Sequence, residues 1–163
     1  MKSFLKSAVF SLCILGFFVF VCMYVTGLSG GGGGGGGATG INPEAGEKIY
    51  WGDGQCHTCH SIGTSGSATR GPNQEGLAAR AEERAKEAGL SSGLEYLVES
   101  IINPAAFVVE GYDNIMPKVY DAPIMLNREQ IQAVLTYLQT LGGESNIEAV
   151  ATFAEKIPEA SGD

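Results

Sequence analysis

The sequence predicts an all-α domain of about four to five helices, preceded by an N-terminal transmembrane helix. Three observations support this fold class. Two stretches, 94–102 and 131–141, carry apolar residues at helical spacing. Three segments start with residues that commonly cap helices. No stretch shows the alternation of apolar and polar residues that is typical of a strand.

The first predicted helix covers residues 43–51. Asn42 is a typical N-cap, and the following proline suits the first helical position because it lacks an N–H group. Gly46 and Tyr50 are four residues apart and therefore share a face, where the glycine lets a second helix approach closely. The run Gly52-Asp53-Gly54 ends this helix.

Two further helices are predicted in the middle of the chain. An alanine-rich, charged stretch over 77–88 is followed by Gly89, a good C-terminal stop. The next helix begins at Ser92, whose spacing to Glu95 matches a capping box, and an Asn-Pro pair stops it after residue 102. Its apolar face comprises Leu94, Leu97, Val98, Ile101 and Ile102.

The last long helix begins at Asn127, with Gln130 three residues later. Its apolar stripe comprises Ile131, Val134, Leu135, Leu138 and Leu141, and two glycines end it. Residues 61–74, rich in Ser, Gly and Thr, and residues 107–125, which lack a sustained period, are expected to be irregular. Within the acidic end of the chain, 147–157 is expected to form at most one loose helix.

Composition divides the chain into four predicted parts. They are a membrane anchor or uncleaved signal-like segment (1–28), a polyglycine linker (29–40), a helical domain (41–143) and an acidic C-terminal tail (144–163). The run from Ala8 to Val25 contains no charge and has the minimum length of a membrane span. Lys2 and Lys6 precede it and no basic residue follows until Lys48, which predicts a cytoplasmic N-terminus and an exported domain.

We expect a retained single-pass anchor in the plasma (inner) membrane, with the domain on the periplasmic or extracytoplasmic side; the alternative is a cleaved signal peptide. The eight glycines from Gly30 to Gly37 would make a flexible tether. The formal net charge is −8, and all the acidic residues lie after residue 41. This balance argues against nucleic acid or anionic lipid headgroups as partners.

The most informative motif is Cys56-His57-Thr58-Cys59-His60. A C-x-x-C-H run is the spacing of c-type haem attachment, in which both thiols bond to one haem and the histidine supplies an axial bond to iron. We therefore predict one covalently bound haem c, with Cys56, Cys59 and His60 as its first contacts. Zinc is the alternative interpretation. A zinc site needs about four ligands, and the sequence offers no second pair of ligands at a distance from this turn.

The second axial ligand has several candidates. Met116, followed directly by a proline in a predicted loop, is favoured. Met125 competes, although it precedes a helix where a core role is natural, and an open or lysine-ligated iron is the remaining option. Pro72, in a Gly-Pro-Asn run, offers a carbonyl that can accept a hydrogen bond from the ring of the ligating histidine. A thioether ligand raises the reduction potential, and two filled axial positions leave electron exchange as the only function, so we predict no enzyme activity.

These residues resemble class I (mitochondrial-type) cytochromes c from about Pro43 to Leu141. The motifs in order are the Gly46/Tyr50 helix, the C-x-x-C-H run, Gly71-Pro72, Met116-Pro117 and the Tyr137-Leu138 helix. The resemblance implies the class I fold around one haem, thioethers at Cys56 and Cys59, axial bonds from His60 and Met116, and Pro72 orienting His60. It also implies that Gly46, Tyr50 and Tyr137 pack where the first and last helices cross.

A narrower stretch, YLVESIINPAAFVVEGYDNIMP, is similar to cytochrome c domains fused to the second subunit of some bacterial haem-copper oxidases and to small anchored cytochromes that feed them. The resemblance implies a tethered carrier of single electrons between respiratory or photosynthetic complexes, with membrane redox complexes as partners. The copper-binding domain of the fused form is not seen, which favours a separate carrier. The alternatives are a fixed cytochrome subunit of an oxidase or dehydrogenase, and a haem enzyme or gas sensor with an open iron site.

Overall fold

A computed structural model describes residues 11–21 and 40–161, and the chain divides into two compact units, Met1–Gly36 and Gly37–Asp163. In the first unit, residues 11–21 are helical. Most of the predicted anchor (1–28) and all of the predicted linker (29–40) except Gly40 lie outside the described residues. Among the residues that are described, no helix has both the length and the apolar character needed to cross a membrane.

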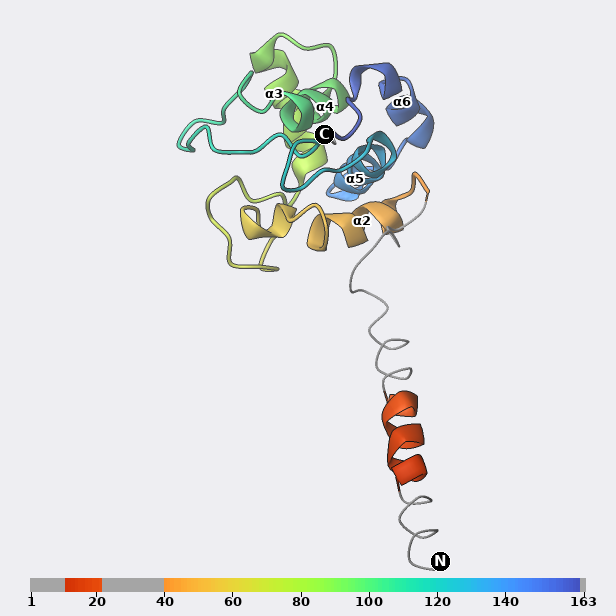
Figure 1. The fold of residues 1–163 in the computed structure, drawn as a ribbon. Coiled ribbons are helices and arrows are strands. Elements are labelled where there is room, and N and C mark those ends of the chain that lie inside the picture. The colour runs from red at the N-terminus through yellow and green to blue at the C-terminus, as the bar shows by residue number, and fades with distance from the viewer. Residues whose placement is uncertain (1–10, 22–39, 162–163) are drawn as a thin grey trace, which may run out of the picture. The chain divides into compact units, whose positions relative to one another are not determined.

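The second unit is built from helices, and the part of the chain that the structure describes contains no strand, which confirms the all-α prediction (Figure 1). One isolated bridge joins Ile62 and Ser65. The elements are α2 (Pro43–Trp51), η1 (Cys56–Thr58), α3 (Leu77–Ala88), α4 (Gly93–Ile102), α5 (Arg128–Thr140), α6 (Ile147–Ala151) and η2 (Ala154–Lys156).

The predicted helix starts are confirmed by the hydrogen bonds of their caps. The Asn42 side chain accepts from the Ala45 N–H at 2.8 Å, and Asn127 and Gln130 form a complete capping box at the start of α5. At the start of α4 only half of the predicted box is present. Ser92 accepts from the Glu95 N–H at 3.1 Å, whereas the Glu95 carboxylate accepts from the Ser91 N–H at 2.9 Å.

The closest helix packing in this unit is between α2 and α5. A Cβ atom at Gly46 would overlap the carbonyl oxygen of Ala133 and lie 2.8 Å from Cβ of Tyr137, so only glycine permits this approach. One turn further along α2, the ring of Tyr50 packs edge-on against that of Tyr137, with centroids 5.6 Å apart. The crossing fixes the end of α2, from which the Cys56 turn continues.

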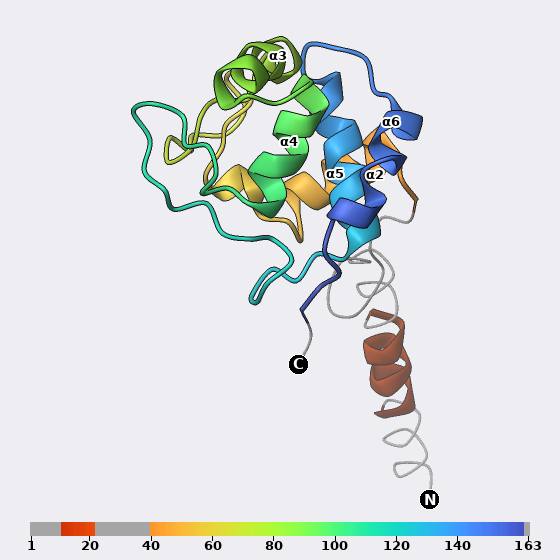
Figure 2. The ribbon, with the colours of Figure 1, turned by 90° about the horizontal axis from the view of Figure 1, so that it is seen from above.

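Two long irregular segments connect these helices, as predicted. Residues 61–74 lead from the motif turn to α3, and residues 103–127 lead from α4 to α5. Figure 2 shows the second segment as a long excursion along one side of the helices.

Residues 144–161 are part of the packed unit, although their acidic composition suggested a tail. Val150 and Ile157 are 0% exposed and belong to the core. Two well-placed apolar side chains therefore anchor a segment whose other residues are mostly polar.

Gly46→Ala should destabilise the domain by about 3 kcal/mol, because the new methyl group overlaps backbone atoms of α5 that cannot move aside. Thermal unfolding followed by circular dichroism should show a Tm lower by roughly 10 °C or more. The matched control is Glu47→Ala, at an exposed position of the same helix, which should stay within a few degrees of the parent. Equal Tm values for the two variants would contradict the close packing.

Candidate haem site

A cavity of about 410 Å³ lies between the motif turn, the helices and the long irregular segment. Its walls include apolar residues of α4 and α5, namely Leu97, Ile101, Ile131, Val134 and Leu138. The five predicted site residues, Cys56, Cys59, His60, Pro72 and Met116, all line it. The structure therefore brings together side chains from positions 56 to 116 around one apolar space.

The motif turn is held by short-range hydrogen bonds. The Gly54 N–H donates to the carbonyl of Ile49 at 2.8 Å, and Gln55 then takes a left-handed conformation (φ 52°) that redirects the chain into η1. The His60 N–H donates to the Cys56 carbonyl at 3.0 Å and closes the turn. No disulfide joins the two thiols, and burial raises the pKa of Cys56 to about 12.

The imidazole of His60 is fixed from two sides. Its Nδ1 lies 2.9 Å from the carbonyl oxygen of Pro72, and because a carbonyl only accepts, Nδ1 carries the hydrogen and donates. Gly71 leaves the space for the ring, since a Cβ atom there would lie 2.7 Å from Nδ1. Burial lowers the pKa of His60, which favours the neutral ring with Nε2 free as a metal ligand.

His57 takes no part in the cavity. Its Nδ1 lies 3.4 Å from the Tyr50 carbonyl, and its ring packs against that of Trp51 at 5.6 Å. It is absent from the residues that line the cavity, whereas its neighbour Thr58 is among them.

The structure separates the candidates for the second axial ligand. Met116 lines the cavity and is half-buried. Met125 is 42% exposed, has a φ of 57° and is not among the cavity residues, although its neighbours Ile124 and Leu126 are. Lys118 is exposed and does not line the cavity either. The geometry thus favours Met116 as the soft ligand available from this segment.

Two buried polar atoms at the cavity lack a partner. The hydroxyl of Tyr50 and Oε1 of Gln74 make no hydrogen bond within the described part of the chain, and both residues line the cavity. Arg70 and Arg84 also reach it, and neither forms an ion pair within the described residues. Unpartnered polar groups and two cations beside an apolar space fit a bound group that is itself largely apolar with anionic substituents. A haem with its propionates has that chemistry.

A family model described as Cytochrome c matches residues 43–142, which is more than half of the chain. The chain belongs to the cytochrome c family. No curated protein gives a significant match. The family carries covalently attached haem c with iron, and the C-x-x-C-H turn that holds it is present in this cytochrome at Cys56–His60.

The family match covers α2 to α5 and therefore almost all of the cavity, but it leaves out the buried segment 144–161. Among the cavity groups not predicted from the sequence are Arg84, Gln74 and the hydroxyl of Tyr50. A signal for Arg84 was present. It lies three residues after Ala81 and seven after Leu77, so it shares a helix face with two buried residues of α3.

Gly71→Ala should displace the His60 ring and weaken its bond to Pro72, because the methyl group would contact both ring nitrogens. We expect a loss of stability of about 1–3 kcal/mol in urea unfolding of the haem protein. The control is Thr69→Ala, an exposed position of the same loop. A Gly71 variant with the stability and visible spectrum of the parent would show that the ring does not need this space.

Met116→Ala should abolish the weak near-infrared sulfur-to-iron charge-transfer band of the oxidised protein. It should also lower the reduction potential by on the order of 0.1 V or more, because a neutral thioether favours ferrous iron. Optical redox titration measures both effects. Met125→Ala is the matched control and should leave band and potential unchanged, since Met125 does not line the cavity. The reverse pattern would assign the ligand to Met125.

Proposed function

We propose that this cytochrome, which belongs to a family of electron-transfer haem proteins, is a membrane-tethered monohaem carrier of single electrons, with His60 and Met116 as axial ligands. The observation that carries the proposal is the cavity itself. It brings together two thiols, an imidazole whose Nδ1 hydrogen is donated to the Pro72 carbonyl, and one thioether, and no other Cys, His, Met or Lys side chain of the described residues lines it.

This donor set favours a carrier over an enzyme. When the haem is bound, it supplies reversible one-electron redox chemistry at iron. In this proposal His60 and Met116 would hold the iron from both sides and leave no open position for O₂ or peroxide, and apolar side chains from α4 and α5 would surround the haem.

Tethering is proposed from the sequence of the first forty residues. The uncharged run from Ala8 to Val25, with lysines only on its N-terminal side, supports an anchor in the plasma membrane with the haem domain on the periplasmic or extracytoplasmic face. The glycine run Gly30–Gly37 supports a long, flexible connection. A tether raises the effective concentration of the domain toward partners in the same membrane, which we propose to be respiratory or photosynthetic complexes.

Membrane fractionation tests the tether. In a host that matures c-type cytochromes, the full chain should sediment with membranes and resist extraction by high salt. A variant with residues 1–40 replaced by a cleavable signal should be soluble, with an unchanged visible spectrum. It should reduce membrane oxidants on the order of tenfold more slowly at micromolar concentration. A full chain found as soluble haem protein would overturn the tether.

The second candidate is a fixed subunit of a larger redox complex, suggested by the similarity of residues 96–117 to oxidase-associated domains. Gentle detergent extraction separates the two: a fixed subunit co-purifies in constant stoichiometry, whereas a carrier separates. Rapid binding of CO to the reduced protein at neutral pH would argue against both and favour an open iron site.

A further inference from the structure

The segment 144–161, here called the C-terminal strap, lies outside the range that matches the family. Hydrogen bonds hold it to the rest of the domain near its start and at its end. At its start, the Asn146 N–H donates to Oε1 of Gln139 on α5 at 2.6 Å. In its middle, Val150 and Ile157 are fully buried. Burial of these two side chains is the main favourable term that holds the strap in place.

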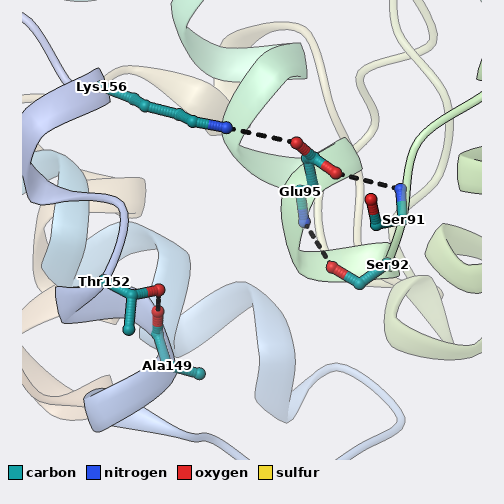
Figure 3. Close-up of polar contacts among 6 residues, drawn as sticks. All are labelled: Ser91, Ser92, Glu95, Ala149, Thr152 and Lys156. Carbon is teal, nitrogen blue, oxygen red and sulfur yellow. Dashed lines mark hydrogen bonds and ion pairs between the residues drawn. The ribbon is translucent and has the colours of Figure 1, made fainter.

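Polar contacts tie the strap to α4 and α5. Nζ of Lys156 lies 3.2 Å from Oε1 of Glu95, the residue whose second oxygen accepts from the Ser91 N–H (Figure 3). Nε of Arg128, at the start of α5, donates to the Ile157 carbonyl at 2.9 Å. The exposed ion pair contributes little by itself, but together these bonds fix the direction in which the strap continues.

The strap ends against the segment that follows Met116. The Ser161 N–H donates to the Tyr120 carbonyl at 3.0 Å, and its hydroxyl donates to Oδ1 of Asp121 at 2.8 Å. The Tyr120 hydroxyl in turn donates to the carbonyl of Ile102 at the end of α4, at 3.2 Å. Val119, next in line, is buried and lines the cavity. The strap is thus hydrogen-bonded to Tyr120, the residue next to the cavity-lining Val119.

The loop that carries Met116 is weakly held along its own length. Within residues 107–117, which the structure describes in full, the backbone hydrogen bonds are local, from Tyr112 to Val109 and from Ile115 to Asp113. Its apolar side chains Val108, Tyr112 and Ile115 line the cavity and do not belong to the buried core of the described residues. Segments with few buried contacts and local hydrogen bonds open at low free energy. The loop therefore depends on its two bases.

The first base is Phe107, whose ring packs edge-on against that of Tyr96 with centroids 5.6 Å apart. The second base is 119–121, where Val119 accepts from the Leu126 N–H at 2.8 Å and where Ser161 binds. We propose that the C-terminal strap, through Ser161 on Tyr120 and Asp121, is a positioning element that keeps the Met116 thioether in the haem cavity. This inference rests on the proposed His60/Met116 ligation.

The test measures exchange of the Met116 ligand for imidazole in the oxidised full-length haem protein at fixed pH. At saturating imidazole, the rate is limited by release of the thioether and opening of the loop. A chain ending at Ala160 loses the Ser161 bonds but keeps both buried anchors. It should exchange roughly threefold to tenfold faster, as expected for the loss of one or two hydrogen bonds.

Point variants separate positioning from general stability. Ser161→Ala and Asp121→Ala should each accelerate exchange about twofold to threefold, and the double variant should add little, because both remove the 2.8 Å bond and Ser161→Ala removes besides it only the longer contact of the hydroxyl with the Tyr120 carbonyl at 3.3 Å. Ser161→Thr keeps the hydroxyl and should restore the parent rate. The control on the strap is Thr152→Ala, whose hydroxyl donates to the nearby Ala149 carbonyl (Figure 3) and to no other group of the described residues, and which should leave the rate unchanged.

Thermal unfolding of each variant by far-ultraviolet circular dichroism reports global stability, which should change far less than the exchange rate. If the parent shows the near-infrared band and the shortened chain and the Ser161 and Asp121 variants exchange at the parent rate, the strap has no positioning role. If the parent itself lacks the band and binds imidazole without a limiting step, the Met116 assignment fails and the strap's role fails with it.

Discussion

The close contact between α2 and α5 at Gly46 is the constraint on which the rest of this cytochrome depends. It sets the position of α2, and the motif turn follows α2 after only four residues. It also sets α5, whose residues Ile131, Val134 and Leu138 form one wall of the cavity. One helix crossing therefore determines how far the two thiols lie from the apolar wall, and a shift of the crossing would change the shape of the whole site.

The parts of this fold that were predictable from the sequence are those fixed by local physics. The starts at Asn42, Ser92 and Asn127 are cap signals that operate within four residues, and the structure confirms each of them. The motif turn and the Gly-Pro pair are likewise short, and they do lie together at one cavity. Axial ligation by Met116 stays a prediction, although the competing candidate, Met125, is exposed and does not line the cavity.

Features that depend on tertiary packing were not accessible in the same way. The segment 144–161 has an acidic composition, and only the placement of Val150 and Ile157 against α5 and its neighbours makes it part of the core. Arg84 belongs to a highly charged helix, and although its spacing from Leu77 and Ala81 indicates a partly buried face, only the packing of α3 shows that this face borders the cavity. In both cases a few residues outweigh the average composition of their segment, which a composition argument cannot detect.

The His60 side and the Met116 side of the site differ in how firmly the chain holds them. The difference follows from the length of the segment that carries each residue. His60 belongs to a turn closed by the Cys56 carbonyl, its ring is held by Pro72, and the loop behind it is braced where the Asn73 side chain exchanges two hydrogen bonds with the Gly63 backbone. Met116 lies near the C-terminal end of the eleven-residue loop 107–117, whose backbone hydrogen bonds among the described residues are only local. A carrier works best when its ligands hold the same positions in both oxidation states. The weakly held Met116 loop therefore needs stabilising contacts from another part of the chain. The hydrogen bonds of Ser161 with Tyr120 and Asp121 provide such contacts.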